Sequence, residues 1–307
     1  MKHYSVLKSE ALHYLNLKSD GIFVDATLGY GGHSSEILST LTSGHLYGFD
    51  QDEEALAYSK KRLSEIGENF SLIHANFVSL KEELNRLGVT EVDGILFDLG
   101  VSSPQIDDSS RGFSFMREEV LDMRMNQSAT FDAKQLLNEY SYEKLCEIFF
   151  QYGEEPRSKF IAKKIVEQRK KKPFVYTTEL VLAIQEAVGA NYFYKTHPER
   201  NIFQAIRIEV NHELEVLKQV LPDAISLLKS GGRICVITFH SLEDRIVKQI
   251  FRTFSEVDPV VKGIPEIPKE YIPKIKLITR KPIEPSSQEL EENSRSRSAK
   301  LRVIERN

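Results

Sequence analysis

The sequence predicts an α/β fold, a mostly parallel sheet into which a helical domain is inserted. Over the first hundred residues, short apolar runs alternate with helical patterns, which is typical of parallel strands joined by right-handed helical crossovers. The alternation stops after Leu99, and from about Gln105 to Thr196 only a polar loop and helical patterns follow. Strand-like runs resume at Arg233. A length of 307 residues allows two domains.

Seven runs rich in Ile, Leu, Val and Phe are expected to form the strands. In the first four of them, apolar and polar residues alternate little, as in strands buried on both faces. The runs are residues 21–27, 45–50, 70–76 and 92–99 before the insertion, and 233–240, 275–280 and 300–306 after it. Helices are expected between the first four strands, at 33–41, 52–67 and 78–88.

The inserted domain is expected at residues 106–199, which leaves 1–105 and 200–307 for the sheet domain. Its helical patterns lie at 131–140, 142–152, 157–171 and 177–189. A long helix is predicted from about Arg200 to Val220 because it carries one apolar stripe, made of Ile202, Ile206, Val210, Leu214 and Leu217. Pro222 is expected to end that helix, and a further helix to reach Ser230. Residues 258–274 are expected to form an extended loop, and residues 285–299 a mobile polar segment.

The charge of the chain is nearly balanced overall but unevenly distributed. A formal net charge of −4 and a hydrophobic fraction of 41% exclude a wholly disordered chain and a histone-like polycation. Residues 157–172 nevertheless hold eight Lys or Arg and one Glu, and residues 294–307 hold five Lys or Arg, Arg302 among them, and one Glu. This distribution suggests an acidic body that carries two basic contact surfaces. On a helix, with Phe160, Ile161, Ile165 and Val166 packed inward, the first group predicts an outward stripe that binds RNA phosphates through Arg157, Lys163, Lys164, Arg169 and Lys170. An ordinary solvated helix face is the alternative.

The cysteines, histidines and N-terminus exclude several classes of protein. Cys146 and Cys235 lie far apart and form no CxxC pair, so two reduced, buried thiols are expected. None of the eight histidines has metal-ligand spacing with another ligand, so no metal is expected. The first residues lack the layout of a signal peptide, and no apolar run approaches the ~20 residues of a membrane helix. A cytoplasmic protein without membrane partners is expected.

A glycine-rich turn follows the first predicted strand, in the segment FVDATLGYGGHS. Gly29, Gly31 and Gly32 stand where nucleotide-binding folds need a tight turn that lets a ligand approach the backbone. Ser34 replaces the third glycine of the pattern G-x-G-x-x-G. The turn therefore indicates a nucleotide site, or else only close packing of a helix on a strand.

The next three predicted strands also end in residues that suit a nucleoside. Asp50 follows Gly29 by 21 positions, where a carboxylate can accept hydrogen bonds from ribose hydroxyls, although it could instead cap the next helix. Phe77 offers an apolar wall for adenine, and Asp98 precedes a Gly/Ser/Pro loop. A nicotinamide dinucleotide and S-adenosylmethionine (SAM) both remain open, but SAM has no phosphate, so the incomplete glycine pattern favours SAM.

The chain resembles the RsmH (MraW) family over essentially its whole length. The resemblance lies in the segments TLGYGGHS, HANF, FDLGVSSPQID, RGFSF, LDMRM, NIFQAIRIEVNHEL, VITFHSLEDRIVK and SRSAKLRV. It implies a class I SAM-dependent methyltransferase, with a Rossmann-like seven-stranded sheet whose last strand is antiparallel and an inserted helical recognition domain. It also implies methylation of the N4 amine of a cytidine in the decoding region of 16S rRNA, in the small ribosomal subunit. The implied SAM contacts are Gly31, Gly32, His33, Asp50, Phe77, Asp98 and Gln105.

Methylation of an exocyclic amine needs no protein nucleophile, but it needs acceptors that orient the amine. The acceptors expected at this sheet edge are Asp98, Ser102 and Ser103. Methylation of cytosine at carbon 5 would instead require a thiolate, and neither cysteine follows a proline or lies in the loop after the fourth strand. The sequence therefore favours the amine over the ring carbon.

Two further segments are candidates for substrate contact. RGFSF offers Arg111, Phe113 and Phe115, whose rings could hold a base that has left its stack or could anchor the insert to a core. His240 ends the fifth strand and could contact RNA or begin the next helix. Methylation of another RNA or of DNA remains an alternative function. So does a ribosome assembly factor that binds SAM and RNA without turnover.

Overall fold

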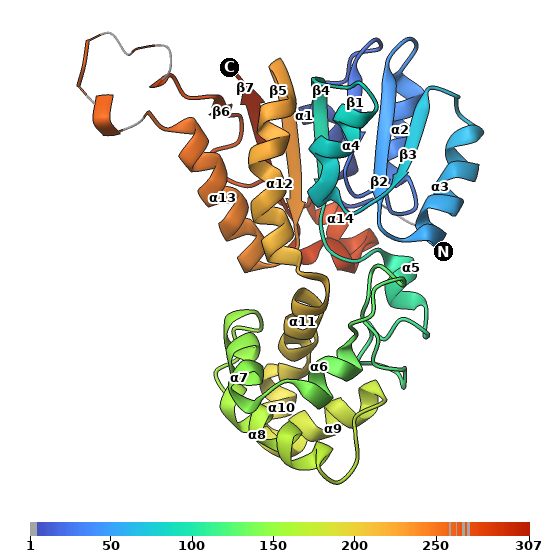
Figure 1. The fold of residues 1–307 in the computed structure, drawn as a ribbon, viewed down its shortest axis with the longest axis vertical. Helices are drawn as coiled ribbons and strands as arrows, with labels where there is room; N and C mark the ends of the chain where they lie inside the picture. Colours follow the sequence, from blue (N-terminus) through green and yellow to red (C-terminus); the bar gives the residue numbers. More distant parts are fainter. Residues whose placement is uncertain (1–4, 258, 262, 266–267, 269–270) are drawn as a thin grey trace. The chain divides into compact units, whose positions relative to one another are not determined.

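The computed structural model describes residues 5–257, 259–261, 263–265, 268 and 271–307 (Figure 1). The chain forms two compact units. The first, which we call the sheet unit, comprises Met1–Gly100 and Leu214–Asn307, and the second, the helical unit, comprises Val101–Glu213. These bounds differ from the expected insertion at 106–199, because the helix that follows residue 197 packs into the core of the helical unit.

The described residues of the sheet unit form one seven-stranded sheet with the order β3-β2-β1-β4-β5-β7-β6. Strand β7 is antiparallel to both of its neighbours, and the other described pairs are parallel. The class I methyltransferase fold expected from the sequence is confirmed. The strands are β1 (Ile22–Asp25), β2 (His45–Asp50), β3 (Phe70–His74), β4 (Val92–Asp98), β5 (Leu228–Thr238), β6 (Ile275–Leu277) and β7 (Lys300–Arg306).

Helices cover both faces of this sheet (Figure 1). Because side chains alternate along a strand, β4 sends Ile95 and Phe97 into one apolar cluster and Leu96 into the other. The first cluster includes residues of α4 (Leu80–Arg86), α12 (Glu213–Leu227) and α13 (Ser241–Ser255). The second includes residues of α1 (Lys8–Leu15), α2 (Gly32–Thr40) and α3 (Glu53–Ser64). Burial on both faces explains why the strands read as continuous apolar runs.

The helical unit has an apolar core of its own. After a short helix, α5 (Ser103–Asp107), a loop leads to α6 (Ala133–Glu139), α7 (Tyr142–Gln151), α8 (Ser158–Arg169), α9 (Thr177–Val188), α10 (Ala190–Thr196) and α11 (Pro198–Asn211). The four helices predicted for the insert are therefore confirmed within two residues at each end. No helix among the described residues is long and apolar enough to span a bilayer.

The single helix predicted from about 200 to 220 is wrong, because the chain breaks at His212. That residue has a φ of 52°, in the left-handed region, and it separates α11 from α12. Ile206 belongs to the core of the helical unit and Leu217 to a core of the sheet unit, so the apolar stripe serves two cores. Pro222 lies inside α12 rather than ending a helix, and α12 stops at Leu227 rather than Ser230.

The C-terminal segment 285–299, expected to be mobile, is helical. It forms α14 (Ser287–Glu292) and a 3-10 helix, Ser294–Ser298. Ser286 caps α14 by accepting from the Glu289 N–H at 3.2 Å, and Ser296 is buried. Of the loop predicted at 258–274, positions 258, 262, 266–267 and 269–270 lie outside the described residues, and Pro259–Val261 forms a 3-10 turn.

Candidate functional site

The glycine turn between β1 and α2 is held by Asp50 at the end of β2. Gly29 and Gly31 have φ values of 50° and 72°, in the region that favours glycine. The Gly29 N–H donates to Asp50 Oδ2 at 2.8 Å, and the Asp52 N–H donates to Asp50 Oδ1 at 2.9 Å. Asp52 is the residue that caps α3, by accepting from the Glu54 N–H. The helix-cap alternative for Asp50 is therefore wrong, and its carboxylate shapes the turn.

Asp25 lies at the same turn, and the sequence reasoning missed it. Its Oδ2 accepts from the Ser34 hydroxyl at 2.7 Å, and its Oδ1 accepts from the Thr27 N–H at 3.2 Å. Burial raises the pKa of Asp25 to about 6, and burial likewise raises the pKa of Asp50 to about 6. The available signal was position, since Asp25 ends β1 four residues before Gly29.

The raised pKa of Asp25 predicts a pH effect on stability. Because the folded pKa lies above the ordinary value of 3.8, the folded state holds this proton more tightly, and stability falls as the pH rises from about 4 to about 6. Asp25→Asn lacks the proton, so its melting temperature should fall less over that range than that of the unaltered protein. Thermal unfolding at each pH measures this, with the exposed Asp20→Asn as a control that keeps the original profile. Parallel profiles for Asp25→Asn and the unaltered protein would contradict it.

Asp98, at the end of β4, has one carboxylate oxygen without a partner. Its N–H donates to Thr27 Oγ1 at 2.6 Å. Its Oδ2 lies 3.6 Å from His33 Nδ1, and the buried His33 also places Nε2 at 3.2 Å from the Val6 carbonyl oxygen. Asp98 Oδ1 is buried and has no hydrogen-bond partner among the described residues. A buried acceptor left in this state is costly, so it marks a place where a ligand donor is needed.

The structure places the other predicted cofactor and acceptor residues as follows. Phe77 begins a 3-10 helix (Phe77–Ser79) just after β3, is half-buried, and packs edge-on against Phe97 with ring centroids 5.7 Å apart. In the helical unit, Ser102 and Gln105 pair with each other: the Gln105 N–H donates to Ser102 Oγ at 3.4 Å, and the Ser102 N–H donates to Gln105 Oε1 at 3.0 Å. The side chain of Ser103 lies outside the described residues.

The chain matches a known methyltransferase family over its whole length. The model of the MraW methylase family matches residues 1–307. The chain belongs to this family. The ribosomal RNA small subunit methyltransferase H of Exiguobacterium sibiricum is 53% identical over 306 residues, which cover 99% of this chain and 98% of that protein. S-adenosylmethionine is therefore the methyl donor of this chain.

Solved structures that resemble this MraW-family chain do so at low identity. An rRNA methylase from Streptococcus thermophilus is 13% identical, with a TM-score of 0.44 over 97% of this chain and 93% of that one. TrmN from Thermus thermophilus is also 13% identical, with a TM-score of 0.44 over 98% of this chain and 48% of that one.

The charges at the turn of this MraW methylase fit SAM better than a dinucleotide. The pKa of Asp98 is raised well above its ordinary value by burial first, and then by the carboxylates of Asp25, Glu243 and Glu289. The pyrophosphate of a nicotinamide dinucleotide would add negative charge to these four acids. SAM carries a sulfonium cation and no phosphate, and its ribose hydroxyls can donate to a carboxylate such as Asp50. The residues present therefore fit the family's cofactor.

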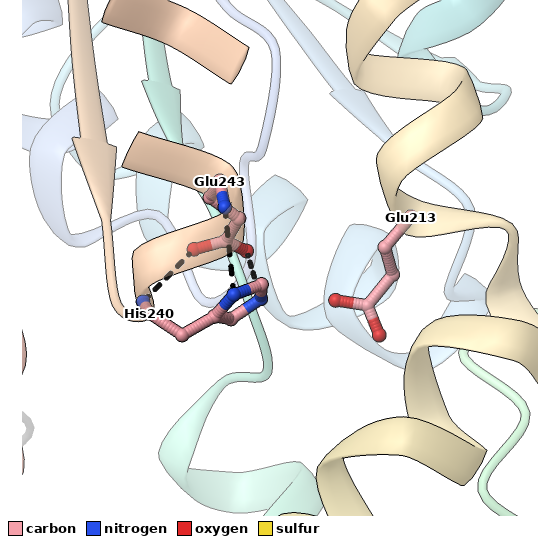
Figure 2. Close-up of side chains that lie close together, drawn as sticks. All are labelled: Glu213, His240 and Glu243. Atoms are coloured by element: carbon pink, nitrogen blue, oxygen red, sulfur yellow. Dashed lines mark hydrogen bonds and ion pairs between the residues drawn. The ribbon is translucent and has the colours of Figure 1, made fainter. Parts of the chain in front are cut away.

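His240 of this MraW methylase caps the start of α13. This is the structural role that was the alternative to contact with RNA. Figure 2 shows the reciprocal arrangement, in which the Glu243 N–H donates to His240 Nδ1 at 3.4 Å and the Glu243 carboxylate accepts from the His240 N–H at 3.4 Å. His240 Nε2 lies 3.2 Å from Glu243 Oε1, but this contact lacks hydrogen-bond geometry. The imidazole thus fixes the start of α13, and its contact with RNA stays a prediction.

The RGFSF segment packs inside the helical unit. Arg111 is buried and donates from its Nη2 to the Arg124 and Met125 carbonyls, both at 3.1 Å. Phe113 and Phe115 pack against the core of the helical unit, and the Phe115 ring meets Phe203 edge-on with centroids 5.6 Å apart. These contacts favour the anchoring alternative over base stacking. The core that holds the two rings is that of the helical unit itself.

The basic helix α8 is less uniformly cationic than the sequence suggested. Arg157 and Arg169 donate to the Val188 and Leu137 carbonyls, both at 2.7 Å. Lys164 pairs with Glu186 at 2.6 Å, and the exposed Lys163 lies 3.9 Å from Glu167. Exposed lysines for which no acidic partner is found among the described residues are Lys159, Lys170 and Lys171.

Two expectations about the basic segments need correction. Phe160 does not pack inward; its exposed fraction is 64%, whereas Ile161 and Ile165 are buried. Arg302, in the second basic segment, is buried in β7 and donates twice to Asp244, at 2.7 and 3.0 Å. The cationic surface of α8 is therefore carried by lysines at its two ends, beside an exposed aromatic ring.

The lysine pair at the end of α8 gives a prediction for RNA binding. Lys170→Gln with Lys171→Gln should weaken RNA binding and reduce the slope of log affinity against log salt by about 0.7 for each single-strand phosphate that is no longer neutralised. Filter binding or fluorescence anisotropy at several salt concentrations measures both. Lys60→Gln with Lys61→Gln is a matched control, because this pair of exposed lysines also lies near the end of a helix, α3 in the sheet unit. Equal slopes for the two double variants would show that Lys170 and Lys171 do not contribute to RNA binding.

Proposed function

We propose that this methyltransferase methylates the N4 amine of a cytidine in the decoding region of small-subunit rRNA. The observation that carries the proposal is the buried, unpartnered Oδ1 of Asp98 at the carboxyl end of β4. An exocyclic amine offers N–H donors, and this oxygen is an acceptor in need of one. The RNA substrate is supported by the relative named ribosomal RNA small subunit methyltransferase H and by the exposed lysines of α8.

Asp98 acts in this proposal by orienting the amine. SAM supplies an electrophilic methyl group on its sulfonium sulfur. The N4 lone pair of cytosine is delocalised into the ring, so an acceptor that holds one N–H and favours a pyramidal nitrogen lowers the barrier. Asp98 accepts best as a carboxylate, and the sulfonium charge of bound SAM would favour that form despite its burial. Of the expected acceptors, Ser102 already accepts from the Gln105 N–H.

The state of the cysteines supports methylation of the amine rather than of carbon 5. Cys235 is buried in β5, where its Sγ lies 3.7 Å from the Ala11 carbonyl oxygen, and burial raises the pKa of its thiol. A thiol in that state is not a nucleophile. Cys146 lies in α7 and packs against the core of the helical unit. We infer that the helical unit contributes RNA contacts, through the exposed lysines at the two ends of α8, Lys159, Lys170 and Lys171.

Transfer of a labelled methyl group tests the proposal. The protein with labelled SAM is incubated with assembled small subunits, naked rRNA and DNA, and the modified nucleoside is then identified by mass spectrometry. N4-methylcytidine in the small-subunit rRNA is the expected product. Label in another RNA, in DNA or at carbon 5 would overturn the assignment. Tight SAM binding with no transfer to any substrate would favour the assembly-factor alternative.

A further inference from the structure

Residues 5–7 form a short strap that contacts the glycine turn. A Cβ added to Gly32 would lie 1.9 Å from Ser5 Oγ, so glycine is the residue that leaves room for the strap. The next residue, His33, places Nε2 at 3.2 Å from the Val6 carbonyl oxygen. Two consecutive residues at the start of α2, both predicted to touch the cofactor, are therefore in contact with the strap.

Glu289, near the other end of the chain, fastens this strap. The Leu7 N–H donates to Glu289 Oε1 at 2.9 Å, across a sequence separation of 282 residues. Leu7 is buried and has a φ of 50° at the start of α1, where no side chain caps the helix. Glu289 itself is placed by α14, whose first turn is capped by Ser286. The carboxylate therefore supplies the partner that the Leu7 N–H would otherwise lack.

We propose that Glu289 is a positioning residue for SAM binding. By holding Leu7, it keeps the Ser5–Leu7 strap against Gly32 and His33, and so fixes the turn in the conformation that receives the cofactor. The inference rests on the proposed placement of SAM at this turn. Preorganising a binding loop improves affinity because less ordering remains to be done on binding. Glu289 acts through the strap and needs no contact with SAM.

The charge of Glu289 has to be separated from its hydrogen bond, because that charge also raises the pKa of Asp98. Two substitutions do this. Glu289→Gln removes the charge and keeps an acceptor oxygen at the same reach. Glu289→Asp keeps the charge but is one methylene shorter, which withdraws the acceptor from the Leu7 N–H. Glu291→Gln, exposed on the same helix, is the matched control.

Titration calorimetry with SAM and with S-adenosylhomocysteine, and amide hydrogen exchange at Leu7, test the proposal on the full chain. Glu289→Asp is expected to raise both dissociation constants about fivefold, the effect of one hydrogen bond, and to speed exchange at Leu7. Glu289→Gln and Glu291→Gln are expected to stay within about twofold of the unaltered protein. Thermal unfolding confirms that each variant is folded.

Two results would overturn the role of the strap. One is weak binding by Glu289→Gln with normal binding by Glu289→Asp, which would make the effect one of charge. The other is a released Leu7 amide in Glu289→Asp with unchanged dissociation constants. An unaltered protein that binds SAM but produces no N4-methylcytidine would instead contradict the proposed function, and the comparison among these variants would still decide the role of Glu289.

Discussion

Asp98→Asn is expected to lower methyl transfer to RNA by about 10²–10³-fold, the usual cost of removing one preorganised group that stabilises a transition state. The free protein should nevertheless fold and be at least as stable as the unaltered one. Asp98 Oδ1 has no partner among the described residues, and burial together with neighbouring carboxylates disfavours its charge. Replacing this carboxylate with a neutral amide of the same shape therefore removes an unfavourable group from the folded state.

Asp93→Asn, at the opposite end of the same strand, is the matched control. Asp93 accepts from the Ile22 N–H at 2.9 Å and from Lys229 Nζ at 2.7 Å, and these partners hold its pKa below the ordinary value. Its replacement should lower the melting temperature and leave the rate of transfer nearly unchanged. Steady-state methylation and thermal unfolding of both variants give the comparison. Turnover by Asp98→Asn at the unaltered rate would remove Asp98 from the reaction.

Gly112→Ala is expected to abolish RNA methylation while SAM affinity stays within about twofold. Gly112 has a φ of +69°, and an added Cβ would lie 2.2 Å from the Val120 carbonyl oxygen and 2.7 Å from the Asp122 nitrogen. Both are backbone atoms, so the RGFSF turn cannot accommodate the methyl group without rearrangement. We expect a loss of stability of about 4 kcal/mol or more, confined to the helical unit.

Gly189→Ala separates backbone strain from the steric clash. Gly189 also lies in the helical unit with a positive φ, +79°, but an added Cβ there meets no atom within 4 Å. It should cost about 1–3 kcal/mol from strain alone and keep RNA methylation. Calorimetric SAM binding and labelled methyl transfer are measured for both variants. Loss of SAM binding by a folded Gly112→Ala would contradict a loss of stability that is confined to the helical unit.

The sheet could be predicted from the sequence because burial on both faces leaves a local mark, the continuous apolar run. The break at His212 leaves no such mark. The stripe from Ile202 to Leu217 keeps helical spacing across it, although its two ends enter different cores. Periodicity reports that a face is buried but not what buries it, so the predicted helix ran through the boundary between the units. The prediction that Phe160 packs inward was wrong for a related reason, because hydrophobic character alone does not show that a side chain is buried.

The candidate site was predicted as far as the carboxyl ends of strands determine it. Gly31, Gly32, Asp50 and Asp98 lie at or just after the carboxyl ends of parallel strands in one sheet, so their meeting at one edge follows from topology alone. Glu289 could not be found in this way. It reaches Leu7 across nearly the whole chain, and neither residue lies in a pattern that points to the other. Asp25 could have been predicted from its position, because it ends β1 just before the glycine turn.

The position of β7 has a consequence for biosynthesis. This strand is the last of the described strands in the sequence, yet it lies between β5 and β6 and is hydrogen-bonded to both. β6 therefore has no strand to join, and one edge of β5 stays open, until residues 300–306 have left the exit tunnel. A nascent chain lacking residues 300–307 should expose an unpaired edge of the kind that chaperones protect from aggregation. The sheet is thus completed only after β7 has been made, because that strand joins two strands that were made before it.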